Sequence, residues 1–208
     1  EMEKEEALFY EPDVVPLIPA FIAGDTEAYT GAAKGTAYHR LMECLDYAHA
    51  DSFEEIREQI QRLVEEKKMT EEEGNCIYIK DILGFARSEL GKRMREAARK
   101  KKLYREQPFV ISVKMKEIQP DWTGEETVLV QGIIDAYFQE DGDLILVDYK
   151  TDRVTSGEGG KLLNLYHSQL ENYAEALERM LKKRVKECYI YSFALEKPIP
   201  VERKQRSG

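Results

Sequence analysis

The chain has 208 residues, of which 42% are hydrophobic and 34% are charged, and its formal net charge is −9. A chain of this length and composition can bury a sizeable core, which excludes a disordered or fibrous protein. No apolar run approaches the roughly 20 residues that span a bilayer, and the N-terminus lacks a signal-peptide pattern. We therefore expect a cytoplasmic protein without membrane contact.

The acidic balance argues at first against a nucleic-acid partner, because Lys and Arg drive phosphate binding by displacing counterions. The charges are unevenly distributed, however, with acidic residues crowded between positions 54 and 73. A basic run follows, consisting of Lys92, Arg93, Arg95, Arg99, Lys100, Lys101, Lys102 and Arg105. Two interpretations of this run remain open, a solvated helix face or a track for a DNA backbone.

Residues 1–30 contain three prolines and little periodicity, so we expect an extended N-terminal arm with at most a short helix. The chain starts without Met, as expected for a piece of a longer polypeptide, although tag removal would leave the same start. Apolar residues then recur at helical spacing from about Ala33 to Ala48 and predict a helix that carries His39. On spacing alone, a lone histidine there is either a surface residue or a metal ligand.

Two capping boxes predict the starts of further helices, Ser52 with Glu55 and Thr70 with Glu73. In each, the hydroxyl and the glutamate can each accept a backbone N–H of the other residue. The first helix should end near Lys68. The second should continue to about Leu90, with Gly91 breaking or bending it before the basic run ends near Lys102. Residues 31–102 are thus predicted to form a helical lobe.

The remaining residues, 103–208, are predicted to form a sheet core. Alternating apolar residues indicate a strand over 103–118. The runs Val128–Phe138 and Leu144–Val147 flank Asp141-Gly142, a pair typical of a tight β-hairpin. A helix over about 163–182 and an interior strand over 185–195 complete the order helix, three strands, helix, strand.

The hairpin brings two carboxylates toward one end of the sheet. Asp135 lies near the middle of its first strand, and Asp148 ends the second, with Lys150 on the same strand face as Asp148. Oxygen ligands of this kind suit Mg²⁺, and an ammonium beside them can stabilise charge on a phosphate. A solvated Asp–Lys pair is the alternative, but Asp148 follows a buried run, where an unpartnered charge is costly.

Two residues outside the hairpin keep open interpretations. Glu106 could assist at the active site or pair with Arg105 at the strand edge. Trp122 could stack on a base or cover the core.

Four motifs in order resemble those of the RecB-like branch of the PD-(D/E)xK nuclease superfamily, and within it the C-terminal nuclease domains of AddA-type helicase–nucleases. They are Gly35–Glu43, Gly132–Asp135, Val147–Thr151 and Gln169–Tyr173. The resemblance implies an α/β, restriction-endonuclease-like core, a mixed central sheet flanked by helices in αβββαβ order, with an N-terminal helical lobe. The nuclease domain would span residues 31–208.

The same resemblance assigns roles to individual residues. His39, Asp135, Asp148 and the backbone carbonyl of Tyr149 would hold one or two Mg²⁺ ions, for which Mn²⁺ could substitute. Asp135, Asp148 and Lys150 would be catalytic, supported by Gln169 and Tyr173. Some relatives hold an iron–sulfur cluster with four cysteines, and this chain, with three, has too few.

The implied activity is metal-dependent exonucleolytic hydrolysis of DNA in double-strand break repair and recombination. Single-stranded ends would arrive from a helicase portion outside this chain, and a partner subunit of AddB type is implied. ATP would bind only in that helicase portion, since no phosphate-binding loop with Lys and Ser or Thr is present here. The alternatives are a catalytically silent DNA-binding or docking module, and a stand-alone exonuclease of phage or CRISPR type.

Overall fold

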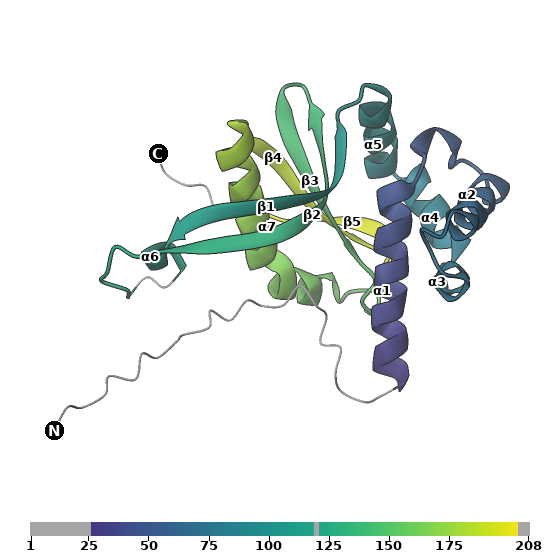
Figure 1. Cartoon of the computed structure of the whole chain (residues 1–208), viewed down its shortest axis with the longest axis horizontal. Helices are drawn as coiled ribbons and strands as arrows, with labels where there is room; N and C mark the ends of the chain where they lie inside the picture. The colour runs from purple at the N-terminus through teal and green to yellow at the C-terminus, as the bar shows by residue number, and fades with distance from the viewer. Residues whose placement is uncertain (1–25, 119–120, 204–208) are drawn as a thin grey trace.

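The computed structural model describes residues 26–118 and 121–203 and shows a mixed α/β fold (Figure 1). Its helices are α1 (Thr26–Cys44), η1 (Tyr47–His49), α2 (Phe53–Glu65), α3 (Glu71–Cys76), α4 (Ile79–Arg87), α5 (Glu89–Arg99), α6 (Met115–Ile118) and α7 (Gly159–Leu181). Its strands are β1 (Leu103–Lys114), β2 (Thr127–Glu140), β3 (Asp143–Lys150), β4 (Val185–Ser192) and β5 (Lys197–Pro200). No described helix is long and apolar enough to cross a membrane.

The five strands form one sheet in the order β1-β2-β3-β4-β5. Only β3 and β4 pair in parallel, and α7 makes the crossover between them. The predicted mixed sheet and αβββαβ order are confirmed. The strand β5 was not predicted, because it contains Pro198 and Pro200, and proline occurs in sheets mainly on edge strands such as this one.

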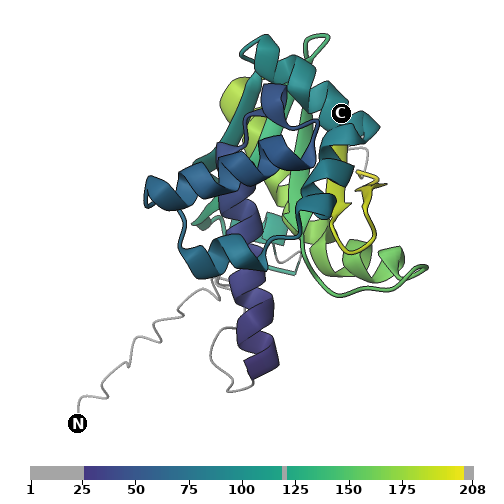
Figure 2. The same ribbon diagram turned by 90° about the vertical axis from the view of Figure 1, so that its right-hand side faces the viewer.

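The sheet separates two hydrophobic cores. Helices α1 to α5 lie on one side of the sheet and α7 on the other (Figure 1), and Figure 2 views the molecule from the side of α1 to α5. Side chains alternate along β3, so Ile145, Val147 and Tyr149 pack into the helical lobe formed by α1 to α5. Leu144 and Leu146 pack on the opposite face against α7. Asp148 and Lys150 continue that second face, which places them on the side of α7.

The hairpin between β2 and β3 is confirmed at the predicted turn. Asp141 and Gly142 both have positive φ angles, of 51° and 96°, as a two-residue type I′ turn requires. Glycine carries no penalty at such an angle, and Asp is one of the few side chains that tolerate it.

Three predicted boundaries are wrong. α1 begins at Thr26 rather than near Ala33; residues 1–25 lie outside the described residues. The first predicted strand ends at Lys114, and the four-residue helix α6 follows it. The helix predicted to run from Thr70 to Leu90 is three helices, because Ile77 and Ser88 both have extended backbone conformations.

The helix break before the basic run lies at Ser88 rather than at Gly91. Gly91 instead allows close packing between α4 and α5. The Ser88 hydroxyl accepts the N–H of Gly91 at 3.0 Å and so caps the start of α5. A Cβ atom at Gly91 would lie 2.1 Å from the carbonyl oxygen of Phe85 and 3.0 Å from the Cα of Ala86. Glycine there allows α5 to start against the end of α4.

Gly91→Ala is therefore expected to lower the free energy of unfolding by about 1–3 kcal/mol, the usual cost of overpacking a core. Gly84→Ala is the matched control, because Gly84 lies in α4 and a Cβ atom there would meet nothing within 4 Å. We expect it to raise stability by about 0.5–1 kcal/mol, as alanine does in helix interiors. Urea denaturation measures both, and equal effects of the two variants would contradict this packing.

The predicted basic run is mostly neutralised within the chain. Arg93 contacts Glu140 at 2.7 Å and Glu187 at 2.8 Å, which joins α5 to the end of β2 and to β4. Arg95 contacts Asp51 at 2.6 Å. Three further cations of α5 and its end pair with carboxylates of the same helix: Lys92 with Glu89, and Arg99 and Lys100 with Glu96. These contacts favour the structural interpretation of the run over a DNA track.

A second ion pair joins α7 to the segment after β5, and its carboxylate also holds the first residue of β4. Arg203 contacts Glu178 at 2.7 Å, and Glu178 also accepts the N–H of Val185 at 2.8 Å. Burial alone would raise the pKa of Glu178, but these two partners outweigh it and lower the pKa below the ordinary 4.5. A lowered carboxyl pKa stabilises the fold above pH 4.5 and loses that contribution as the pH falls through the folded-state pKa.

Glu178→Gln is thus expected to cost about 1–2 kcal/mol at pH 7 and progressively less as the pH falls below 4.5. Urea midpoints measured between pH 3 and pH 8 test this. Glu202→Gln, at an exposed position, is the control. A Glu178→Gln deficit that stays constant across the whole range would contradict the linkage.

Candidate metal centre and active site

The site is built where β2 separates from β3. The two strands pair from Glu140 back to Ala136, and at the next position the Asp135 carboxylate accepts the N–H of Tyr149 at 2.8 Å. Ala136 packs into the core on the helical side and Ile134 into the core on the α7 side, although they are two residues apart. The strand therefore twists sharply at Asp135, whose side chain is only 11% exposed.

Glu106 lies across from this twist on β1. Its backbone φ of 45° is in the left-handed region, and it interrupts a ladder that pairs Arg105 with Ala136 and Gln107 with Ile134. Such a conformation is costly for a glutamate and persists only when its surroundings impose it. Of the two interpretations left open for Glu106, the pairing with Arg105 is disfavoured, because the Arg105 guanidinium donates to the carbonyl of Leu45 at 2.7 Å.

His39 reaches the same point from α1. Its Nδ1 atom lies 3.3 Å from an oxygen of Asp135. The preceding residue anchors the helix, since the buried Tyr38 hydroxyl donates to Asp81 of α4 at 2.6 Å. One turn earlier, a Cβ atom at Gly35 would lie 3.4 Å from the Thr151 hydroxyl, so α1 passes close to the end of β3.

Asp148 and Lys150 lie together at the end of β3, with 2.6 Å between a carboxylate oxygen and the ammonium nitrogen. The Asp148 side chain is 2% exposed and that of Lys150 is 13% exposed. Among the described residues, neither Asp148 oxygen has a partner with hydrogen-bond geometry. Two buried oxygens held by one neighbouring cation are the kind of arrangement that a further cation would stabilise.

The donor set fits a hard divalent cation. His39, Glu106 and Asp135 each offer one ligand atom, and these atoms all lie within 4.8 Å of one another. One imidazole with carboxylate oxygens suits Mg²⁺ or Mn²⁺ better than a soft metal. Asp148 is not a member of that close group, but it directly precedes Tyr149, whose N–H the Asp135 carboxylate accepts, so it lies beside the group.

The ionisable groups of the site are strongly perturbed. Burial raises the pKa of Asp148 to about 6, with Lys150 opposing the shift and Asp135 adding to it. Burial and the charge of Asp135 raise the pKa of Glu106 to about 7. Burial also opposes ionisation of Asp135, but His39, Lys150 and the Tyr149 N–H together lower its pKa. Carboxylates crowded in this way repel one another, and a bound cation would relieve the repulsion.

Gln169 and Tyr173 lie on one face of α7, as predicted, and bond to each other at 2.8 Å. The Tyr173 ring is 4% exposed and packs edge-on against Phe109, with 5.4 Å between ring centroids. Burial raises the pKa of Tyr173 to about 12, and the charges of the site carboxylates contribute. Tyr173 therefore belongs to the core on the α7 side, and the charges of the site carboxylates reach its hydroxyl, to which Gln169 donates.

Tyr149 combines two tasks. Its backbone N–H donates a hydrogen bond to the Asp135 carboxylate. Its side chain is buried in the core on the helical side, with its hydroxyl 3.3 Å from that of Tyr47. This packing fixes the end of β3 against the helical lobe. Trp122, in contrast, is 40% exposed and donates to Glu126, so it does not cover the core.

Sequence reasoning left one central residue undecided and missed another. Glu106 remained open between two interpretations, and its left-handed backbone cannot be read from residue type. Tyr166 on α7 was missed: its ring lies under the Lys150 ammonium, 4.2 Å from nitrogen to centroid. Its spacing from Gln169 and Tyr173 places all three on one helical face, which is the signal that could have identified it.

Comparisons with known proteins agree with this geometry. The family model described as PD-(D/E)XK nuclease superfamily matches residues 17–206. The A subunit of the ATP-dependent helicase/nuclease of Clostridium perfringens (strain SM101) is 40% identical over 190 residues, which cover 89% of this chain and 15% of that protein. The protein of the same name from Alkaliphilus oremlandii is 42% identical over 183 residues, covering 87% and 15% respectively.

A third relative, the protein of the same name from Clostridium botulinum (strain Loch Maree), is 38% identical over 206 residues, or 97% of this chain and 16% of that protein. The chain thus spans about 15% of the length of the relatives that it matches. The resemblance inferred from the four motifs is confirmed. The chain belongs to the PD-(D/E)XK nuclease superfamily, and nearly all of it is homologous to a segment of helicase/nuclease A subunits.

Proposed function

We propose that the chain hydrolyses DNA phosphodiester bonds with the help of a bound divalent cation, Mg²⁺ in the cell and Mn²⁺ as a substitute. The observation that carries the proposal is the convergence of His39, Glu106 and Asp135 within 4.8 Å, beside the buried Asp148 oxygens. Membership of a nuclease superfamily supplies the reaction class.

His39, Glu106 and Asp135 would hold the cation, together with Asp148; the carbonyl of Tyr149 joins them by family resemblance. The cation would lower the pKa of a bound water and polarise a phosphoryl oxygen. Lys150 carries a fixed positive charge in a site that is largely closed to solvent, where it would stabilise charge developing on the phosphate. Gln169 and Tyr173 would support this side of the site from α7.

The names of the relatives suggest a wider setting. We propose that the chain is the nuclease part of a helicase–nuclease of AddA type, which degrades DNA ends in the cytoplasm during double-strand break repair and recombination. Single-stranded ends would arrive from the helicase part, which would bind the ATP, and a partner subunit of AddB type would complete the enzyme. A site that retains its complete set of ionisable residues disfavours a catalytically silent module.

The direct test uses the purified chain and end-labelled single-stranded and double-stranded DNA. With Mg²⁺ we expect degradation that EDTA stops and Mn²⁺ restores. Salt-sensitive binding without cleavage under every metal condition would instead establish the silent DNA-binding module.

Glu106→Gln tests the ligand group by binding as well as by activity. The amide keeps the size of the side chain but removes its charge, so we expect the affinity for Mn²⁺ to fall at least about tenfold. Isothermal titration calorimetry measures that affinity without DNA. The control is Glu125→Gln, at an exposed surface ion pair. Unchanged Mn²⁺ affinity in Glu106→Gln would remove Glu106 from the site.

A further inference from the structure

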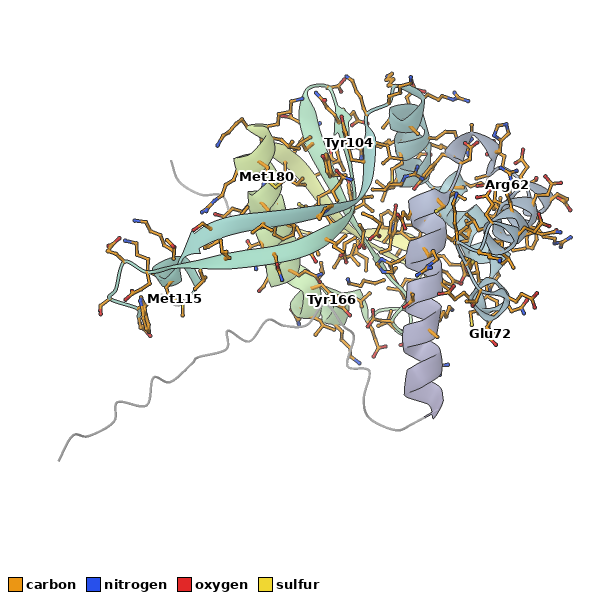
Figure 3. All side chains as sticks on the ribbon, in the orientation of Figure 1. Arg62, Glu72, Tyr104, Met115, Tyr166 and Met180 are labelled. Atoms are coloured by element: carbon orange, nitrogen blue, oxygen red, sulfur yellow. The ribbon has the colours of Figure 1, made fainter. Side chains whose placement is uncertain are left out.

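Lys150 has a second partner that the proposed chemistry does not yet use. Its ammonium lies 4.2 Å from the centroid of the Tyr166 ring, on the face of α7 that also carries Gln169. Figure 3 labels Tyr166 in the N-terminal part of that helix. The Tyr166 hydroxyl donates to Asp152 at 3.0 Å, two residues beyond Lys150 along the chain. The ring is therefore fixed at its far end while its face meets the ammonium.

The two partners of Lys150 differ in what they leave available. Asp148 is an anion with a carboxylate oxygen 2.6 Å from the ammonium nitrogen, so it neutralises the charge of Lys150. An aromatic face attracts a cation through its quadrupole, but it carries no net charge and accepts no full hydrogen bond. An ammonium held by such a face keeps its charge and its N–H groups for a substrate.

This difference matters once Asp148 takes part in binding a cation. Its negative charge is then shared, and its hold on Lys150 weakens. The side chain of lysine is long and flexible, so it needs another restraint to stay at the reacting phosphate. A neutral restraint is the suitable one, because a second carboxylate would repel the substrate phosphate.

We propose that Tyr166 is a positioning residue that holds the Lys150 ammonium at the substrate phosphate through the face of its ring. Asp152 orients that ring by accepting its hydroxyl. This inference rests on the proposed nuclease function. It assigns to α7 a role in placing the catalytic charge, in addition to its packing on the sheet.

The kinetic test compares two substitutions with a matched control. Tyr166→Phe keeps the ring face and should retain most of the turnover. Tyr166→Leu removes the face, and we expect kcat to fall about tenfold with KM changed by less than about twofold, which corresponds to about 1.4 kcal/mol of lost transition-state stabilisation. Tyr78→Leu is the control, because it removes a comparable contact, with Lys34 at 4.6 Å, in the helical lobe.

A second measurement needs neither DNA nor metal. Limited acylation of surface amines, followed by peptide mass spectrometry, reports how freely the Lys150 amine moves into solvent. We expect labelling of Lys150 to increase several-fold in Tyr166→Leu and to stay near the wild-type level in Tyr166→Phe. Thermal melting of each variant verifies that the fold is retained.

The outcomes separate this inference from the proposed function. A wild-type chain that cuts no DNA would refute the nuclease function, while the labelling would still test the contact. If Lys150 in Tyr166→Leu is labelled only to the level seen in the wild-type chain, the positioning role is overturned. A rise in KM at unchanged kcat would also overturn it and would make Tyr166 a DNA-contacting residue instead.

Discussion

Asp135→Asn is expected to abolish DNA cleavage, with kcat reduced at least about a thousandfold, the upper range for loss of one preorganised electrostatic group. The reason lies in the two partners of this carboxylate. An asparagine keeps one oxygen that can accept the Tyr149 N–H, so the twist of β2 should survive. It loses the charge that lies 3.3 Å from His39 and that would bind the cation.

The measurements are single-turnover cleavage, Mn²⁺ titration and far-ultraviolet circular dichroism. We expect activity and metal affinity to fall together at unchanged secondary structure. Asp121→Asn, in the exposed loop before β2, is the control. An Asp135→Asn variant with wild-type Mn²⁺ affinity would show that the cation binds elsewhere.

Lys150→Met should be nearly as severe, at about a hundredfold to a thousandfold in kcat, but for a different reason. Methionine retains an apolar stem of similar length and loses only the ammonium, which is no metal ligand. Mn²⁺ affinity should therefore stay within a few-fold of wild type. Lys150→Arg keeps the positive charge but should not retain turnover, because a guanidinium is planar and wider than the ammonium that fits between Asp148 and Tyr166.

The contrast between the two variants is the informative result. We expect Asp135→Asn to lose both Mn²⁺ affinity and turnover, and Lys150→Met to lose turnover alone. Lys161→Met removes a surface ammonium paired with Glu158 and is expected to have no effect on either quantity. Loss of Mn²⁺ binding in Lys150→Met would mean that Lys150 maintains the site rather than acting on the phosphate.

Features set by local chemistry were predictable from the sequence. The hairpin turn follows from the φ preferences of Asp141 and Gly142. The capping boxes of α2 and α3 start at Ser52 and Thr70 because their hydroxyls and the glutamates three residues on satisfy each other's backbone. The four motifs placed His39, Asp135, Asp148 and Lys150 on the elements where the structure has them.

Features set by distant partners were not predictable. The cations of α5 form a continuous basic run in the sequence, which left a DNA track open as an interpretation. In the structure, Arg93 and Arg95 pair with carboxylates 44 to 94 residues away along the chain. The break at Ser88 was missed because apolar residues continue on both sides of it, with Phe85 and Leu90 both buried. Glu106 was left undecided because only the assembled sheet shows it facing Asp135 and His39.

The central claim is that His39, Glu106 and Asp135 hold one divalent cation beside Asp148. A crystal of the chain soaked in Mn²⁺ and measured at the manganese absorption edge tests it most directly. We predict an anomalous peak within about 2.0–2.3 Å of a His39 ring nitrogen and of carboxylate oxygens from Asp135 and Glu106. The absence of a peak there, in a crystal that takes up Mn²⁺ elsewhere, would contradict it.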